Sequence, residues 1–376
     1  MRVFIADDSI LIRNIVKELL DTDPGILLVG EATNGADAAE RVLNLKPDIV
    51  IMDVDMPIMN GLEATRLIAA SSTIPVLIFT HNTEPELPFR ALQLGAVDFL
   101  LKPDFSDVNK PEYVSAFIAR LRALSRRGNG GRSIPGTPGT PDSPAPRGNA
   151  VSAVHRSSAH RPDAPAAETA TRSTGQALAM TADPAFLPRA SVVVVGASTG
   201  GPQAVSHLLS SLLKPFPLPI VLVQHIETGF DRGYAEWLSS ETGHRVVLAS
   251  DGEEPQPGTV YVAPTDHHLK FANARFVLDD GPKVLNQKPS VDTMFASAAR
   301  QYGELTLGVL LTGMGTDGAD GCAAVRSAGG FTVVQDEASS LIYGMPRAAV
   351  LRGAASRILA LDAIGPFVDA VAGRMR

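Results

Sequence analysis

The fold of the C-terminal half is decided by the stretch SVVVVGASTGG, residues 191–201. Its four consecutive valines, residues 192–195, are typical of a strand buried on both faces of a parallel sheet. The glycines that follow permit a sharp turn, and the residues from Gln203 onward have a helical pattern. The stretch therefore predicts a strand, a turn and a helix, and with them an α/β domain that begins near residue 190.

Apolar runs further along the chain extend this domain. Additional buried strands are predicted at residues 220–223, 308–311 and 331–334, with helical stretches between them. Three segments in the middle are expected to form antiparallel hairpin pieces, at residues 258–264, 269–271 and 276–278. We therefore expect a doubly wound, Rossmann-like three-layer domain with a hairpin insertion over residues 190–376.

The N-terminal part of the chain predicts a second α/β domain. In residues 1–125, helical patterns alternate with short β-branched runs, and a chain of 376 residues is longer than one hydrophobic core usually needs. Five βα units indicate a doubly wound parallel sheet of the flavodoxin-like kind. The five strands are expected at residues 3–5, 27–29, 49–52, 76–79 and 99–101.

The composition changes between these two domains. Residues 126–189 are rich in Pro, Ser, Thr, Gly and Ala, as in the run PGTPGTP at residues 135–141. Such a segment buries too little apolar surface to offset the entropy of ordering it. We predict a long disordered linker there.

Composition also excludes several classes of protein. The net charge is −7 and neither folded segment carries a basic stripe, so we expect no nucleic-acid partner. No apolar run approaches the ~20 residues that span a bilayer, so we expect no insertion into the membrane. The single cysteine, Cys322, excludes an intrachain disulfide framework and fits a reducing compartment. With no export signal visible, a cytoplasmic location is expected.

Charged and polar residues follow the strands of the first domain. Asp7 and Asp8 follow strand one, Asp53 follows strand three, Thr80 follows strand four and Lys102 follows strand five. Functional groups gather at the carboxyl ends of parallel strands, and three converging carboxylates require a cation, for which Mg²⁺ is suited. Asp53 would then accept a phosphoryl group whose oxygens Lys102 and Thr80 contact.

The same residues resemble the response-regulator receiver family. The resemblance implies that Asp53 is the phosphoacceptor, that Asp7 and Asp8 help it hold Mg²⁺, and that Thr80 and Lys102 form the switch pair. Phe99 stands where the family has an aromatic switch residue, although a plain core phenylalanine is an equal alternative. The residues that carry the resemblance are Asp7-Asp8, Asp53, Met56-Pro57, Asn60-Gly61, Thr80 and Lys102-Pro103.

In the second domain, residues 196–200 fit the pattern G-x-S-x-G, which exposes a serine hydroxyl beside a helix N-terminus. A glycine-rich loop before a helix could equally hold a phosphate, so the pattern alone decides nothing. A serine nucleophile needs a base and an acid that orients it. His225 and Asp317 both follow predicted strands at the same sheet edge as Ser198, whereas the other histidines do not.

Five motifs of this domain resemble the catalytic domain of the chemotaxis protein-glutamate methylesterase family, CheB. The resemblance implies hydrolysis of glutamate methyl esters on methyl-accepting chemoreceptors, often with deamidation of receptor glutamines, with Ser198 as nucleophile, His225 as base and Asp317 as its orienter. Gln287-Lys288 departs from the His-Arg pair expected before Pro289. The motifs are GASTGG (196–201), Gln224-His225, PSVD (289–292), LTGMGTDG (311–318) and GMP (344–346).

Three further expectations follow for this domain pair. Backbone N–H groups near Thr199 and Met314 are candidates for an oxyanion hole, although simple loop packing is an equal alternative for Met314.

A chemotaxis histidine kinase is the expected phosphodonor, and phosphorylation of Asp53 is expected to free a site that the receiver obstructs. The alternatives are a nucleotide-binding output domain or a transcription regulator, but the basic helix-turn-helix that the latter requires is not recognisable.

Overall fold

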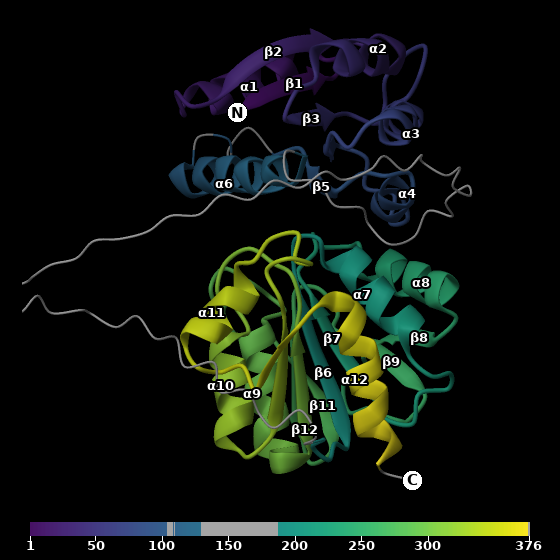
Figure 1. The fold of residues 1–376 in the computed structure, drawn as a ribbon, viewed down its shortest axis with the longest axis vertical. Helices are drawn as coiled ribbons and strands as arrows, with labels where there is room; N and C mark the ends of the chain where they lie inside the picture. Colours follow the sequence, from purple (N-terminus) through teal and green to yellow (C-terminus); the bar gives the residue numbers. More distant parts are fainter. Residues whose placement is uncertain (104–107, 109, 129–186, 375–376) are drawn as a thin grey trace, which may run out of the picture. The chain divides into compact units, whose positions relative to one another are not determined.

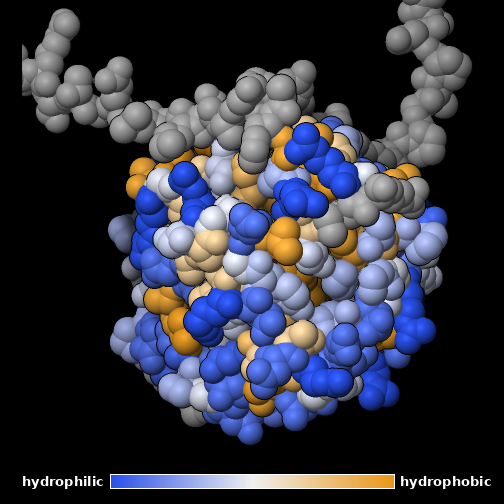
Figure 2. Space-filling view, turned by 90° about the horizontal axis from the view of Figure 1, so that it is seen from below, coloured by the Kyte–Doolittle hydropathy of each residue, from blue (hydrophilic) through white to orange (hydrophobic). Residues whose placement is uncertain are grey.

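The computed structural model describes residues 1–103, 108, 110–128 and 187–374. Most of the predicted linker, residues 129–186, therefore lies outside the described residues. Within the described ranges, no helix combines the length and the apolarity that crossing a membrane requires. On the face of the protein seen in Figure 2, apolar residues lie in small groups among hydrophilic ones, as is usual for a protein surface.

The N-terminal domain is the predicted five-stranded parallel sheet (Figure 1). Its strand order is β2-β1-β3-β4-β5, so the order reverses between β1 and β3, and sheets of this kind bind their ligands at the carboxyl ends of the strands beside such a reversal. Helices α1 and α6 pack on one face and α2, α3 and α4 on the other. The elements are β1 (Arg2–Ala6), α1 (Ile10–Asp21), β2 (Leu27–Ala32), α2 (Gly35–Leu45), β3 (Ile49–Met52), α3 (Gly61–Ser71), β4 (Val76–Thr80), α4 (Leu87–Gln93), β5 (Asp98–Leu101) and α6 (Pro111–Gly128).

The C-terminal domain is a seven-stranded parallel sheet in the order β14-β13-β12-β6-β7-β9-β8. Helices α9, α10 and α11 cover one face and α7, α8 and α12 the other, which gives the expected three layers (Figure 1). The elements are β6 (Val192–Ala197), α7 (Gly201–Ser211), β7 (Ile220–Gln224), α8 (Asp231–Thr242), β8 (Arg245–Leu248), β9 (Thr259–Val262), β10 (His268–Ala272), β11 (Arg275–Asp279), α9 (Val291–Tyr302), the 3-10 turn η1 (Gly303–Leu305), β12 (Thr306–Leu310), α10 (Ala319–Ser327), β13 (Phe331–Gln335), α11 (Met345–Leu351), β14 (Arg357–Leu359) and α12 (Leu361–Gly373).

The hairpin prediction is confirmed in part and corrected in part. β10 and β11 do pair antiparallel, with Leu269 opposite Leu278. Residues 258–264 are not a hairpin piece, because β9 pairs parallel with both β7 and β8 inside the main sheet. All four residues of β9 are buried, as expected for a strand that is covered on both faces. Short apolar runs with glycine and proline at their ends fit either arrangement, so the sequence did not distinguish them.

Candidate active site

Three neighbouring strands deliver the three predicted catalytic side chains to one edge of the seven-stranded sheet. β6 ends directly before Ser198, β7 ends directly before His225, and the loop after β12 carries Asp317. The strands are adjacent in the order β12-β6-β7 and run parallel, so their carboxyl ends meet. The predicted convergence of these residues is therefore present in the structure.

Backbone hydrogen bonds define the turn that presents Ser198. Its N–H donates to Thr312 O at 3.0 Å, and Gly201 N–H donates to Ser198 O at 2.7 Å. Gly200 has φ +74°, in the left-handed region where only glycine is unstrained. A Cβ at Gly200 would also lie 2.6 Å from Leu341 Cβ. The glycine in this motif thus meets both a conformational and a steric requirement.

The loop after β12 packs directly against the serine. A Cβ at Gly313 would lie 2.8 Å from Ser198 Cβ and 2.2 Å from Met345 Sδ, so only glycine fits there without displacement. Gly313 O accepts hydrogen bonds from the N–H groups of Gly344 and Met345, which belong to the GMP motif. This motif therefore supports the loop that lies beside Ser198.

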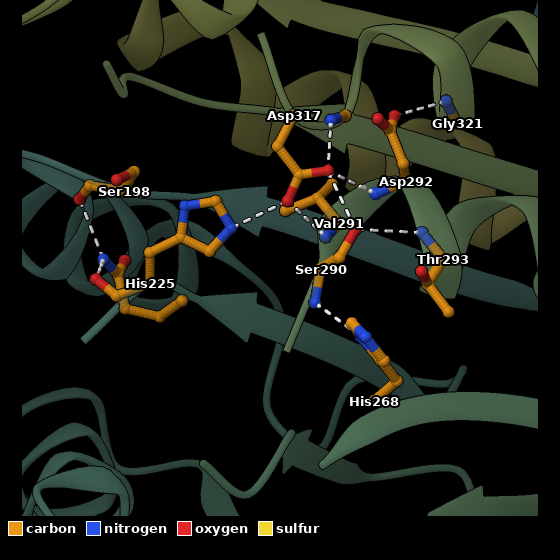
Figure 3. Close-up of polar contacts among 11 residues, drawn as sticks. Ser198, His225, His268, Ser290, Val291, Asp292, Thr293, Asp317 and Gly321 are labelled. Carbon is orange, nitrogen blue, oxygen red and sulfur yellow. Dashed lines mark hydrogen bonds and ion pairs between the residues drawn. The ribbon is translucent and has the colours of Figure 1, made fainter. Parts of the chain in front are cut away.

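His225 and Asp317 form a buried hydrogen-bonded pair. His225 Nε2 lies 2.9 Å from Asp317 Oδ2, and both side chains are nearly inaccessible to solvent. The other ring nitrogen, Nδ1, is buried without a partner and lies on the side of the ring that faces Ser198 (Figure 3). Among the described residues, no hydrogen bond joins Ser198 Oγ to this ring. Contacts of this kind are often long before substrate binds.

Asp317 accepts five hydrogen bonds. Burial would raise the pKa of this carboxyl, but the hydrogen bond and charge of His225 and the N–H groups of Asp292 and Val291 hold it below its usual value of 3.8. The carboxylate therefore stays ionised at neutral pH, as an acid that orients an imidazole must. The five donors, at 2.8–3.0 Å, are His225 Nε2, Ser290 Oγ and the N–H groups of Val291, Asp292 and Gly318.

Two backbone donors near Ser198 have no acceptor. In the part of the chain that the structure describes, neither Thr199 N–H nor Met314 N–H makes a hydrogen bond. The rest of this region is well satisfied, since Thr312 Oγ1 donates to Thr199 O at 3.0 Å and accepts from Ile342 N–H at 2.9 Å. Unused N–H groups in an otherwise bonded loop are what an oxyanion hole needs.

The sequence interpretation gave no role to three buried polar residues. Gln224 Nε2 donates to Ser198 O at 2.8 Å and to His225 O at 3.0 Å, so it joins the backbones of both residues. Thr312 and Ser290 contact the serine turn and Asp317 as described above. All three stand inside the quoted motifs, and Ser290 has the further signal of a helix N-cap position before α9.

Gln287-Lys288, which replaces the His-Arg pair expected from the family resemblance, lies in a tight turn next to the site. Gln287 and Val284 exchange backbone hydrogen bonds at 2.8 and 3.0 Å. Lys288 Nζ donates to Asp280 O at 3.1 Å, so its ammonium is used within the loop itself. The pair is followed by Pro289 and then by Ser290, which contacts Asp317.

In the N-terminal domain, the predicted acidic residues form one cluster. Oxygen atoms of Asp7, Asp8 and Asp53 all lie within 4.8 Å of one another. Lys102 Nζ lies 2.7 Å from Asp7 Oδ2 and 3.0 Å from Asp53 Oδ1. Burial raises the pKa of Asp53, Lys102 lowers it, and repulsion from Asp7 raises it again, so the net direction is upward. Three carboxylates with one ammonium fit an oxygen-binding divalent cation such as Mg²⁺.

The Asn60-Gly61 motif supports the Asp53 loop. Asn60 is the N-cap of α3, and its Oδ1 accepts from Glu63 N–H at 2.9 Å. A Cβ at Gly61 would lie only 1.7 Å from Asp53 O, so the helix can approach the Asp53 loop only with glycine here.

The candidate switch residues lie on neighbouring strands. Thr80 ends β4, and its Oγ1 accepts from Asn82 N–H at 3.1 Å. Phe99 lies on β5 opposite Ile78, with its ring edge-on to Phe89 at 6.1 Å. Lys102 N–H donates to Thr80 O at 2.9 Å, which links the two predicted switch positions through the backbone.

A receiver domain joined to an α/β domain with a Ser198-His225-Asp317 site defines a response regulator with a hydrolase-like output domain. The family model for CheB methylesterase matches residues 193–368, and that for the response regulator receiver domain matches residues 3–110. The chain belongs to the CheB methylesterase family.

Relatives extend over nearly the whole chain. A protein-glutamate methylesterase/protein-glutamine glutaminase of Anaeromyxobacter dehalogenans is 38% identical over 97% of this chain and 95% of its own. One of Ralstonia nicotianae is 38% identical over 98% of this chain and 95% of its own. Among solved structures, the Thermotoga maritima CheB methylesterase catalytic domain is 38% identical, covers 48% of this chain and 98% of its own, and has a TM-score of 0.47.

Proposed function

We propose that this protein hydrolyses glutamate methyl esters on methyl-accepting chemoreceptors and also deamidates receptor glutamines. The observation that carries the proposal is the His225 ring, with Nε2 bonded to the ionised Asp317 and Nδ1 free on the side of Ser198 (Figure 3). The names of relatives that match over almost the full chain support the substrate class. The arrangement of the three residues supports nucleophilic catalysis by serine.

The proposed reaction has two halves. Ser198 Oγ attacks the ester carbonyl while His225 Nδ1 accepts its proton, and the N–H groups of Thr199 and Met314 stabilise the oxyanion, each by about 2.7–4 kcal/mol. His225 returns the proton to the leaving methoxide, so methanol departs and a glutamyl ester of Ser198 remains. Water, deprotonated by His225, then cleaves that ester to give the glutamate carboxylate. With a glutamine substrate, ammonia replaces methanol as the leaving group.

Methanol release from methylated chemoreceptor tests this assignment. Ser198→Ala should lower kcat at least about 10³-fold, because the nucleophile is removed from an otherwise intact site. Ser210→Ala, an exposed serine on α7, is the matched control and should keep activity within about twofold. A Ser198→Ala protein as active as the control would show that another residue is the nucleophile.

We further propose that phosphorylation of Asp53 activates the hydrolase and supports sensory adaptation. The phosphodonor would be a chemotaxis histidine kinase, and Asp7, Asp8 and Asp53 would hold Mg²⁺. When bound, the metal neutralises charge on the phosphoryl group and on its acceptor. Lys102 would hold a phosphoryl oxygen, and Thr80 would bond another. Phe99 would follow Thr80 and change the surface of β4 and β5, through which the receiver would act on the hydrolase.

A further inference from the structure

A second histidine lies behind the orienting acid. Ser290, which is fully buried, is the N-cap of α9. Its Oγ accepts from Thr293 N–H at 3.3 Å and donates to Asp317 Oδ1 at 2.9 Å. Its own N–H donates to His268 Nδ1 at 3.2 Å (Figure 3). Polar contacts therefore run without interruption from His268 through Ser290 and Asp317 to His225.

The partners of His268 determine its tautomer. Ser290 N–H can only donate, so His268 Nδ1 must be the unprotonated acceptor. His268 Nε2 then carries the hydrogen and donates it to Pro282 O at 2.9 Å. His268 is only 2% exposed, so water does not replace either contact. Its ring is thus a neutral bridge between β10, the loop after β11 and the start of α9.

The start of α9 governs the geometry of Asp317. Three of the five donors to this carboxylate belong to the consecutive residues 290–292, the Ser290 hydroxyl and the next two N–H groups. A displacement of Ser290 would shift all three together and would leave its buried N–H without an acceptor. The hydrogen bond from His225 to Asp317 depends on the position of this same carboxylate.

We propose that His268 is a positioning residue of the hydrolase site, acting through Ser290 on Asp317 and thereby on the orientation of His225. This inference rests on the proposed function. His268 touches none of the reacting groups, so removing its contact to Ser290 should lower kcat and leave KM nearly unchanged. A histidine that only fills the core would affect stability instead.

The test compares two substitutions in the full-length protein. His268→Leu fills the space without an acceptor, whereas Asn in His268→Asn can place its Oδ1 near the position of Nδ1. We expect kcat for methanol release to fall about 5- to 20-fold in His268→Leu, with less than a twofold change in KM, because a buried donor loses its partner. His268→Asn should recover most of that loss. Ser290→Ala, which removes one donor to a charged acceptor, should lower kcat about 10- to 100-fold.

NMR tests the same inference without turnover. In ¹⁵N spectra of the wild-type protein, the His268 ring should show a protonated Nε2 and an unprotonated Nδ1. The hydrogen-bonded Nε2 proton of His225 should shift or broaden in His268→Leu and return towards its original position in His268→Asn. Melting temperatures identify any variant that fails to fold. Even if a variant does not fold, the tautomer of His268 can still be measured in the wild-type protein.

The outcomes separate this inference from the proposed function. If wild-type protein releases no methanol, the proposed function fails, and the His225 proton signal still decides whether His268 positions the pair. If wild-type protein is active but His268→Leu keeps its kcat while melting at a lower temperature, His268 is structural only. Equal losses in the leucine and asparagine variants would also overturn the inference, because the acceptor would then not matter.

Discussion

Asp53 and Asp317 are both buried aspartates at the carboxyl end of a parallel sheet, yet their pKa values move in opposite directions. Asp53 shares its surroundings with two other carboxylates, those of Asp7 and Asp8, and with one cation, Lys102, and burial raises its pKa. Asp317 is buried as well, but five donors converge on it and its pKa is lowered. The comparison teaches that the number of donors, and not burial alone, sets the state of a buried acid.

The two states suit two different chemistries. A carboxylate that accepts a phosphoryl group beside a cation must keep oxygen atoms free for both, so an incompletely bonded group is useful in the receiver. A carboxylate that orients an imidazole must stay charged and immobile, so complete hydrogen bonding is useful in the hydrolase. The carboxyl-end edge of the five-stranded sheet therefore carries the proposed phosphoacceptor, and the corresponding edge of the seven-stranded sheet carries an acid held in place by hydrogen bonds.

Removing the charge of Asp317, the acid that five hydrogen bonds hold in place, should have the largest effect on catalysis. In Asp317→Asn an amide replaces one oxygen, so five donors face a single acceptor and the His225 tautomer is no longer enforced. We expect kcat for methanol release to fall by about 10³–10⁴-fold with little change in KM. Asp320→Asn, an exposed neighbour in the same region, is the control and should stay within a few-fold. Comparable losses in both variants would mean that loop disruption, and not orientation, is being measured.

Removing Asp53, the proposed phosphoacceptor, should abolish activation by phosphorylation but leave basal catalysis. With Mg²⁺ and a small phosphodonor, wild-type activity should rise on the order of 100-fold, which needs only ~2.7 kcal/mol between two states of the receiver. Asp53→Ala should remain at the basal rate, and Asp21→Asn should respond like wild type.

A protein lacking residues 1–125 should be constitutively faster than the unphosphorylated full-length chain. If it is no faster, obstruction by the receiver is the wrong mechanism and recruitment to the receptor becomes the better account.

The smallest expected effect is that of Asp53 on the melting temperature and on its dependence on pH. Because the folded-state pKa of Asp53 lies above its usual value of 3.8, the native state loses stability as this group ionises, from about pH 4 upward. Without Mg²⁺, Asp53→Asn should therefore melt about 2–4 °C higher than wild type at pH 7.5, and the difference should shrink towards pH 4. Added Mg²⁺ should raise the melting temperature of wild type more than that of the variant. A larger difference at pH 4 than at pH 7.5 would reverse the sign and contradict the pKa direction.

Much of the molecule could be predicted from local patterns. The five receiver strands, the strand and turn before Ser198, and the hairpin of β10 and β11 all follow from short apolar runs and glycine positions. Topology then placed Ser198, His225 and Asp317 at one edge, since parallel strands in one sheet share the direction of their carboxyl ends. Strand β9 was misplaced, because an apolar run of four residues fits both a hairpin and a buried parallel strand.

The sequence by itself determined which residues can do chemistry, because residue type and position relative to strand ends are local properties. Only the tertiary structure decided how those residues are bonded. The five donors to Asp317 come from the residue after β7, the N-cap and first turn of α9, and its own loop, and His268 reaches Ser290 across 22 positions of the chain. Which ring nitrogen of His225 meets Asp317 depends on these long-range contacts. They arise from packing between elements distant in sequence, and no local pattern encodes a hydrogen-bond partner that far away.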